Sequence, residues 1–134
     1  MKLRALGALA VTLALAFITP AHAELNRTDR SLVLVTTGSI IVATLCPGFD
    51  ILKGANKKQA EINGADFDGL APVIGAAMAA QLGQDYDSSL LIPEVTRTVR
   101  SFFLEMDVDF DRNKARACKK WSDVLLPAGV LTRK

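Results

Sequence analysis

Beyond its first 27 residues, the chain places apolar side chains at helical spacing in several segments, and the first of these is the longest. Residues 28–46, TDRSLVLVTTGSIIVATLC, are apolar on most sides and stop at Pro47, which cannot continue a helix. We interpret this segment as a helix that is capped by Thr28 or Asp29 and carries Cys46 in its last turn. The side chains expected to be buried are Leu32, Val35, Ile40 and Ala43.

A β-hairpin is the alternative for the same segment. Residues 32–35 and 40–43 are rich in β-branched side chains, and residues 36–39, TTGS, could form a turn between them. A lone two-stranded hairpin is only marginally stable unless other elements pack on it. We therefore favour the helix and keep an α+β fold with an N-terminal hairpin over residues 32–43 as the alternative.

Glycine and proline divide the rest of the chain into further helical segments. The expected helices cover residues 56–62, closed by Asn63-Gly64, residues 70–82, ended by Gly83, residues 93–106, and residues 111–126. Pro72 is tolerable only in the first turn of its helix. Side chains that recur at spacings of three and four residues predict two core faces, one made by Val95, Val99, Phe102, Phe103 and Met106 and one by Ala115, Cys118, Trp121 and Leu125. The pattern predicts an all-α fold, a bundle of about four helices in a single domain over residues 24–134.

The N-terminus has the order of parts that is typical of a secretory signal. Two basic residues near the start precede an apolar run over residues 5–18, and the cleavage pattern Ala21-x-Ala23 follows. The run of 14 residues is shorter than the roughly 20 that are needed to span a bilayer. We expect cleavage after Ala23 and a mature protein that is soluble in the periplasm, without a membrane span; secretion beyond the cell is the alternative.

Cleavage there would also change the chemistry that the chain can offer. It removes His22, the only histidine, and with it the side chain most used as a general base and metal ligand. Loss of Lys2 and Arg4 leaves 14 basic side chains against 14 acidic ones. Such a balanced and interspersed charge provides no electrostatic footprint for nucleic acid or an anionic membrane. No catalytic motif is present, so we expect a non-catalytic protein without a metal or cofactor.

The two cysteines, Cys46 and Cys118, are predicted to form a structural disulfide. Two cysteines in a small exported domain usually pair. This pair would close a loop of about 72 residues, for which the chain-entropy estimate is roughly 4 kcal/mol. A redox-active pair is disfavoured because it usually requires a C-x-x-C arrangement. Trp121 lies one helical turn after Cys118, and we expect it to pack against the disulfide.

Three alternating aspartates, Asp107, Asp109 and Asp111, match the opening of an EF-hand calcium loop. The match ends there, because Arg112 stands where the loop needs glycine and Cys118 stands where it needs glutamate. We therefore expect Asp109 or Asp111 to cap the last helix instead of holding calcium.

Two other groups of charges have simple structural interpretations. Asp66 and Asp68 suit the start of the helix expected near Leu70. Several cations could gather on the last two helices and hold a small anion, although a solvated face is expected because aspartates are interspersed. These cations are Arg97, Arg100, Arg112, Arg116, Lys119 and Lys120.

In size, export and cysteine count the chain is similar to the small two-cysteine helical proteins of the periplasm, which include acid-stress chaperones and inhibitor or immunity proteins. No shared motif accompanies this likeness, so it assigns no residue a role. We expect a partner-binding or chaperone-like protein that is a monomer or a weak homodimer. A small-ligand or ion-binding protein is the alternative, and an enzyme is the third hypothesis. An exposed apolar patch would favour the first, and a closed pocket with convergent polar groups the second.

Overall fold

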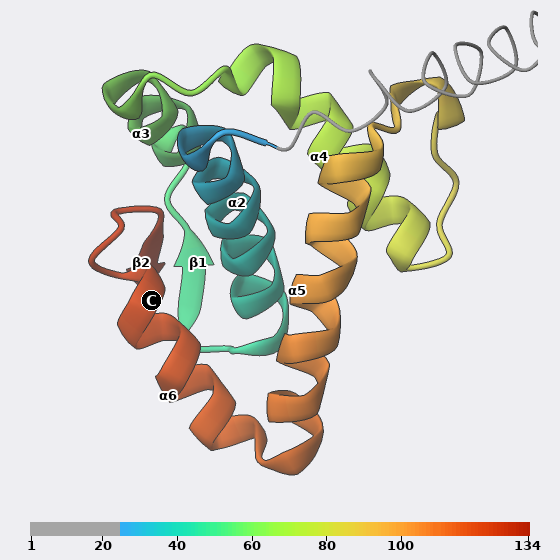
Figure 1. Ribbon diagram of the computed structural model, residues 1–134. Coiled ribbons are helices and arrows are strands. Elements are labelled where there is room, and N and C mark those ends of the chain that lie inside the picture. Colours follow the sequence, from blue (N-terminus) through green and yellow to red (C-terminus); the bar gives the residue numbers. More distant parts are fainter. Residues whose placement is uncertain (1–24) are drawn as a thin grey trace, which may run out of the picture.

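The computed structural model describes residues 25–134, so the predicted signal over residues 1–23 lies outside the described residues. The described chain contains five α-helices, a 3-10 helix and two short strands (Figure 1). In chain order the elements are α2 (Arg27–Leu45), β1 (Phe49–Ile51), α3 (Ala55–Asn63), α4 (Phe67–Gln81), η1 (Ser88–Leu90), α5 (Pro93–Arg112), α6 (Lys114–Leu125) and β2 (Leu131–Arg133). The predicted small all-α fold is confirmed, and the hairpin alternative over residues 32–43 is wrong.

The helix α2 is the centre of the fold. It contacts α3, α4, α5, α6 and β1, and its buried residues face several directions. They are Leu32, Val33, Thr36, Thr37, Gly38, Ser39, Ile41 and Val42. Of the expected buried side chains only Leu32 is confirmed, since Val35, Ile40 and Ala43 are half-buried. A segment that is apolar on most sides is surrounded by other helices instead of presenting one stripe to a core.

Among residues 25–134, α2 is the one helix whose length and composition would allow it to cross a membrane. Its place in the fold accounts for that composition. Nearly half of its most apolar stretch of 18 residues is buried against the rest of the chain. We therefore interpret α2 as the core helix of this domain.

Local capping decides where α2 begins and ends. Asn26 Oδ1 accepts hydrogen bonds from the backbone N–H of Asp29 and from Thr28 Oγ1, both at 2.8 Å. The prediction that Thr28 or Asp29 caps the helix is therefore wrong, because the carboxamide of Asn26 reaches the free N–H groups first. At the other end Cys46 is extended, as is usual for a residue that precedes proline.

The short helix α3 lies between two glycines. Gly54 and Gly64 both have positive φ, 77° and 74°, a conformation that glycine adopts without strain. The predicted closure of this helix at Asn63-Gly64 is confirmed.

The helix α4 begins at Phe67, three residues earlier than expected. Asp66 caps it by accepting a hydrogen bond from the N–H of Gly69 at 3.0 Å, which confirms a helix-start role for this acidic pair. Pro72 consequently lies beyond the first turn, where it leaves the carbonyl of Asp68 without its usual intrahelical donor. Packing of the apolar face of α4 on α2 and α5 compensates for this loss.

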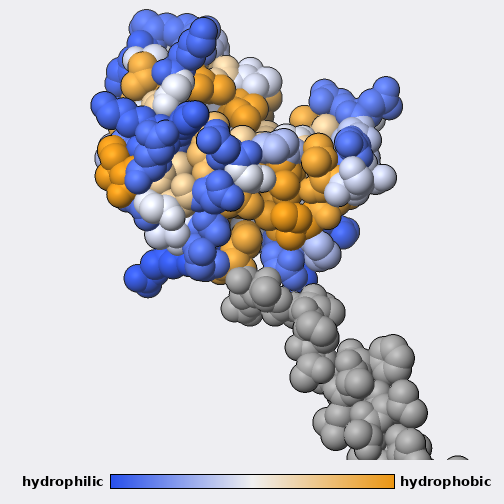
Figure 2. All heavy atoms as spheres, turned by 90° about the horizontal axis from the view of Figure 1, so that it is seen from above, coloured by the Kyte–Doolittle hydropathy of each residue, from blue (hydrophilic) through white to orange (hydrophobic). Residues whose placement is uncertain are grey.

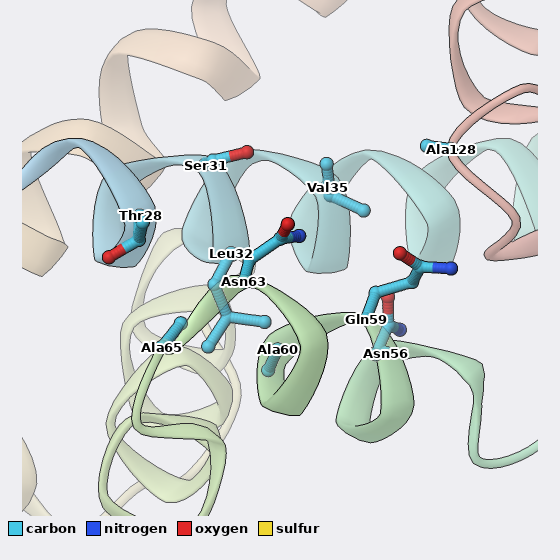
Figure 3. Close-up of a pocket in the computed structure, with 10 residues that line it drawn as sticks. All are labelled: Thr28, Ser31, Leu32, Val35, Asn56, Gln59, Ala60, Asn63, Ala65 and Ala128. Carbon is cyan, nitrogen blue, oxygen red and sulfur yellow. The ribbon is translucent and has the colours of Figure 1, made fainter.

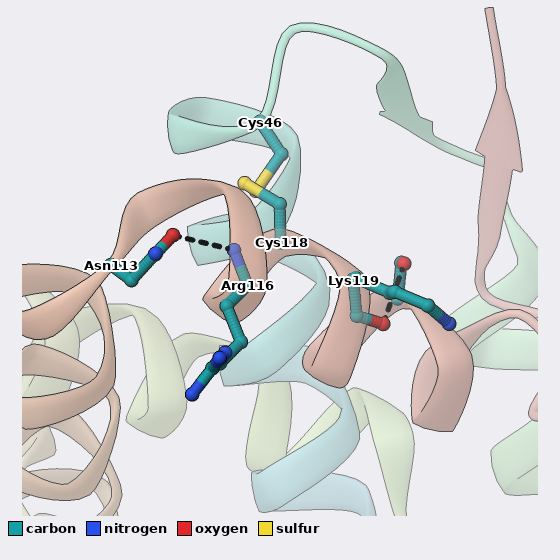
Figure 4. Close-up of a disulfide and its surroundings, with 6 residues drawn as sticks. Cys46, Asn113, Arg116, Cys118 and Lys119 are labelled. Carbon is teal, nitrogen blue, oxygen red and sulfur yellow. Dashed lines mark hydrogen bonds between the residues drawn. A yellow bond between two sulfur atoms is a disulfide. The ribbon is translucent and has the colours of Figure 1, made fainter.

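A single residue separates α5 from α6. Asn113 has an extended backbone, and its Oδ1 caps α6 by accepting a hydrogen bond from the N–H of Arg116 at 3.0 Å (Figure 4). The expected start of α6 at residue 111 is therefore wrong, and α5 continues to Arg112. The reason is that the core face of α5 extends to Phe110, which packs against the buried cluster.

Asp107, Asp109 and Asp111 consequently lie within the last turns of α5. They form neither a calcium-type loop nor the cap of α6, and the prediction that Asp109 or Asp111 provides that cap is wrong. The buried face of α6 also differs from the predicted one, since Ala115 is exposed. The buried residues of α6 are Ala117, Trp121, Ser122 and Leu125.

Two links join the end of α2 to the C-terminal part of the chain. Cys46 and Cys118 form the predicted disulfide, with their Cα atoms 5.8 Å apart (Figure 4). Cys46 is 1% exposed and Cys118 is half-buried. Just after Cys46, β1 pairs antiparallel with β2, with Phe49 opposite Arg133. This small sheet was not predicted.

Candidate functional site

An apolar groove runs along α2 between α5 and α6, which diverge from their corner with α2 between them (Figure 1). It consists of two adjoining hollows of about 430 and 420 Å³ that share Arg30, Leu34, Phe102 and Trp121. We call it the α2–α5–α6 groove. Its other lining residues are Arg27, Ser31, Val35, Arg97, Thr98, Ser101, Glu105, Val124 and Leu125.

Two aromatic rings form the base of this groove. The rings of Phe102 and Trp121 meet edge to face, with centroids 5.2 Å apart and an interplanar angle of 86°. This is a favourable arrangement for aromatic pairs. Gly38 of α2 makes room for it, because a Cβ atom at that position would lie 3.2 Å from Phe102 Cε1. The base of the groove is therefore a close-packed junction of three helices.

Polar contacts hold the indole of Trp121 in place. Its Nε1–H donates a hydrogen bond to Asp109 Oδ2 at 3.0 Å. The same oxygen accepts a hydrogen bond from Lys120 Nζ at 2.6 Å, and that ammonium lies 4.7 Å from the centre of the indole ring. Trp121 belongs to the same buried cluster as Cys46, against which Cys118 also packs, and its aromatic partner is Phe102. Asp109, which the sequence pattern placed in a helix cap, instead anchors the indole.

The surroundings of Asp109 change its acidity. The hydrogen bond from Lys120 holds the pKa of the Asp109 carboxyl below its ordinary value, and partial burial opposes this effect. The charge of Lys120 and the hydrogen bond from Trp121 lower the pKa of Asp109 further. Asp109 therefore stays ionised at pH values where an ordinary aspartate begins to take up a proton.

Positive charge predominates at the edges of the groove. Arg27, Arg30 and Arg97 line it, with Glu105 as the one acidic lining residue. The ion pairs within residues 25–134 join Lys57 to Asp68, Lys119 to Asp123 and Lys120 to Asp109, so none involves these arginines. The groove can thus offer guanidinium groups beside an apolar surface.

The structure only partly assembles the predicted cluster of cations. Arg97 lines the groove, whereas Lys119 and Lys120 are paired with aspartates. Arg112 and Arg116 lie beside Asp109 at a separate small hollow of about 80 Å³. The arginines that join Arg97 come from the first turn of α2. The sequence analysis considered the start of α2 only for its helix cap, so it did not identify Arg27 and Arg30 as groove residues.

A second, smaller site lies between α2 and α3 (Figure 3). This cavity of about 130 Å³, which we call the α2–α3 cavity, is lined by neutral side chains. The polar ones are Thr28, Ser31, Asn56, Gln59 and Asn63, and the apolar ones are Leu32, Val35, Ala60, Ala65 and Ala128. The spacing of 56, 59 and 63 along one helix face was a signal that could have identified it.

Apolar side chains are also exposed outside these two sites, as orange areas among the blue ones in the view from above (Figure 2). The most exposed large ones in the described chain include Ile62, Leu82, Leu104, Val108 and Val124, and only the last of these lines the groove. Within residues 25–134 no three His, Cys, Asp or Glu side chains are grouped closely enough to hold a metal ion.

Comparison of the chain with protein-family models, with curated proteins and with solved structures finds no match.

Proposed function

We propose that this chain is an exported, non-catalytic protein of the periplasm that binds an acidic, amphipathic segment of a partner protein in the α2–α5–α6 groove. The observation that carries the proposal is the groove itself, which combines an apolar, aromatic base with three arginines and one glutamate. Amphipathic helices commonly bind in apolar grooves between helices. The excess of positive charge favours a partner segment with acidic side chains along its flanks.

The chemistry of the lining residues supports a protein partner. Tryptophan and arginine are enriched among the residues that dominate binding energy at protein interfaces. Phe102 and Trp121 provide rigid apolar surface, and Val124, 59% exposed, extends it along α6. Arg27 and Arg30 lie one helical turn apart, so both can contact acidic groups on one side of a bound helix.

Export is supported by independent features. The order of basic, apolar and small residues over positions 1–23 is that of a secretory signal. The Cys46–Cys118 disulfide suits an oxidising compartment, because such bonds rarely persist in the cytosol of mesophiles.

A fluorescence titration tests binding in the groove directly, because Trp121 is the only tryptophan of the chain. The probe is an amphipathic helical peptide of about 18 leucine and glutamate residues, long enough to follow α2. We expect a saturable change in Trp121 emission, with an affinity at least about tenfold higher than for the equivalent leucine and lysine peptide. Equal affinity for the two peptides would contradict the charge argument.

Charge reversal in the groove provides the matched test. The combined substitutions Arg27→Glu, Arg30→Glu and Arg97→Glu should weaken binding of the leucine and glutamate peptide at least about tenfold. The control, Lys53→Glu, Lys58→Glu and Lys134→Glu, changes the net charge equally at exposed positions outside the groove. It should leave the affinity within about twofold. A stable homodimer that buries Trp121 in the absence of peptide would show instead that a second copy occupies the groove.

A chaperone-like form of this function predicts a response to acid. At about pH 2.5 most carboxylates are protonated and the basic side chains repel one another. The pKa of Asp109 is lowered by Lys120, and that of Asp87 by the Ser89 hydroxyl. Each contributes stability that is fully present above the ordinary carboxyl pKa and is lost as pH falls through the lowered folded value. We therefore expect a loosened, helix-containing state whose expansion the disulfide limits.

Dye binding, circular dichroism and light scattering by an aggregating client protein, compared at about pH 2.5 and pH 7, measure this response. Suppression of client aggregation only in acid would support the chaperone-like form. Loosening without suppression would support a partner-binding protein that acts while folded. A fold that is unchanged in acid would contradict the electrostatic argument.

A further inference from the structure

A further apolar hollow lies where the C-terminal ends of α2 and α4 meet α5. It has a volume of about 310 Å³, and its lining includes Thr44 and Leu45 of α2, Gln81 and Leu82 at the end of α4, and residues of α5. We call it the α2–α4–α5 hollow. It shares no lining residue with the α2–α5–α6 groove or with the α2–α3 cavity, so it is a separate candidate site.

The hollow combines buried apolar side chains with an exposed rim. Its buried lining residues are Ile41, Met78, Phe103 and Met106. At the rim, Leu45 is 39% exposed and Leu82 is 56% exposed. Methionine side chains are flexible and polarisable, and they adapt to apolar groups of different shapes. An apolar ligand can therefore enter from solvent and cover leucine surface that is otherwise in water.

The size of the hollow favours a small molecule over a protein segment. A cavity of about 150 Å³ encloses benzene, which has six heavy atoms, so a hollow of twice that volume accommodates on the order of ten heavy atoms. An α-helix with its side chains is about 10 Å across and would not fit inside. An alkyl chain with a compact head group has the required size.

The electrostatics of the hollow favour a cation. Asp107 is the one charged residue of its lining, it is exposed, and no ion pair within residues 25–134 involves it. Both α2 and α4 end at the hollow, and neither has a basic residue in its last turn. Because the C-terminus of a helix carries a partial negative charge, three features of the same sign border the hollow. The α2–α5–α6 groove, in contrast, has arginines at its edges.

We propose that the α2–α4–α5 hollow binds a small amphipathic cation, with an alkyl chain against the buried apolar side chains and an ammonium group at the rim beside Asp107. The ammonium group stays in contact with water at the exposed rim, so its binding does not require the large cost of burying a charge. The inference goes beyond peptide binding in the groove and does not depend on it, because the two sites share no residue.

Nuclear magnetic resonance titration of the oxidised protein tests this site with three probes. They are hexyltrimethylammonium, hexanesulfonate, which has the same chain and an anionic head, and tetramethylammonium, which has the same head without the chain. Met78 and Met106 are the only methionines after Met1, and both line the hollow, so their ε-methyl signals report binding there.

We expect saturable shifts of both methyl signals with hexyltrimethylammonium, with a dissociation constant on the order of millimolar. Hexanesulfonate should bind at least about tenfold more weakly, because its head group meets the negative rim. Tetramethylammonium should cause no saturable shift, because it lacks the apolar chain. Equal or tighter binding of hexanesulfonate, a saturable response to tetramethylammonium, or none to hexyltrimethylammonium would overturn the proposal.

Variants at exposed positions keep the test independent of folding. Asp107→Asn should reduce the preference for hexyltrimethylammonium over hexanesulfonate at least about threefold. Its control, Glu61→Gln, removes an exposed carboxylate on α3 and should leave that preference unchanged. Leu82→Ala should weaken binding of hexyltrimethylammonium at least about threefold, whereas Ile62→Ala, at a residue that is 66% exposed outside the hollow, should not. Variants that behave like their controls would contradict the proposed site.

A second copy of the chain is the other occupant that the titration can detect. Methyl signals of Met78 and Met106 that shift with protein concentration in the absence of a probe would show that a second copy covers the hollow, which would also overturn the proposal. Because Trp121 emission reports the groove and the methionine methyl groups report the hollow, failure here is distinguishable from failure of peptide binding.

Discussion

Replacement of Cys46 and Cys118 by alanine is expected to lower the free energy of unfolding by about 4 kcal/mol. The disulfide joins residues 72 apart in the chain, so it removes a large loop-closure entropy from the unfolded state. The β1–β2 pairing closes a longer, overlapping loop, but only in the folded state, and cannot substitute for the disulfide. At about 4 °C per kcal/mol for a domain of this size, the midpoint of thermal unfolding should fall by roughly 15–20 °C.

Denaturant unfolding of the oxidised protein and of the double variant measures this change. The wild-type chain after reduction should unfold at a midpoint close to that of the variant, which separates loss of the link from loss of the cysteine side chains. A difference below about 1 kcal/mol between oxidised protein and variant would contradict the entropic argument. The same variant also tests the groove, because the disulfide ties α6, one wall of the groove, to the end of α2 (Figure 4).

Trp121→Ala is expected to lower the free energy of unfolding by about 3–5 kcal/mol, the usual range for removing a large buried aromatic side chain. Trp121 is 7% exposed and joins Phe102 of α5 to the Asp109–Lys120 pair. Its removal leaves a void at the junction of three helices and frees an acceptor on Asp109. Trp121→Phe keeps an apolar ring but loses the N–H donor, so we expect a smaller loss of about 1–2 kcal/mol.

Val124→Ala is the matched control, since Val124 is on the same helix but 59% exposed, and it should change stability by less than about 0.5 kcal/mol. Circular dichroism must follow the unfolding, because the two Trp121 variants lack the only tryptophan. If Trp121→Ala were no more destabilising than Val124→Ala, the three-helix junction would not contribute to stability as we describe.

The disulfide and the Trp121 junction together hold the α2–α5–α6 groove open. A groove that leaves Leu34 and Phe102 half-buried and Val124 exposed lacks burial that a closed core would provide. The disulfide and the Trp121 junction lie at the walls and base of the groove and offset that loss. The double cysteine variant and Trp121→Ala should loosen α6 against α2. We therefore expect each to weaken peptide binding by more than the loss of folded protein alone would explain.

The sequence by itself determined the features that depend on neighbours in the chain. Pro47, Gly64, Gly83 and Pro93 mark helix ends correctly, because the loss of an N–H donor or the access to positive φ is a property of the residue. The repeat from Val95 to Met106 predicts the buried face of α5 apart from Phe102, which is half-buried, because spacing along a helix decides which side chains share a face. The pairing of the two cysteines follows from their number and from the expected compartment.

Only the tertiary structure decided which residues from distant segments meet. The strands β1 and β2 have three residues each, too few to show an alternating pattern, and their pairing depends on where α6 ends. The helix α5 continues past Asp107 and Asp109 because Phe110 packs against the buried cluster, and Asn113 then caps the start of α6. Arg27, Arg30 and Arg97 converge on the groove, and the carboxamides of α3 face α2, because several helices pack around one that is apolar on most sides. Such packing depends on side-chain contacts between segments far apart in the sequence, which a local pattern does not contain.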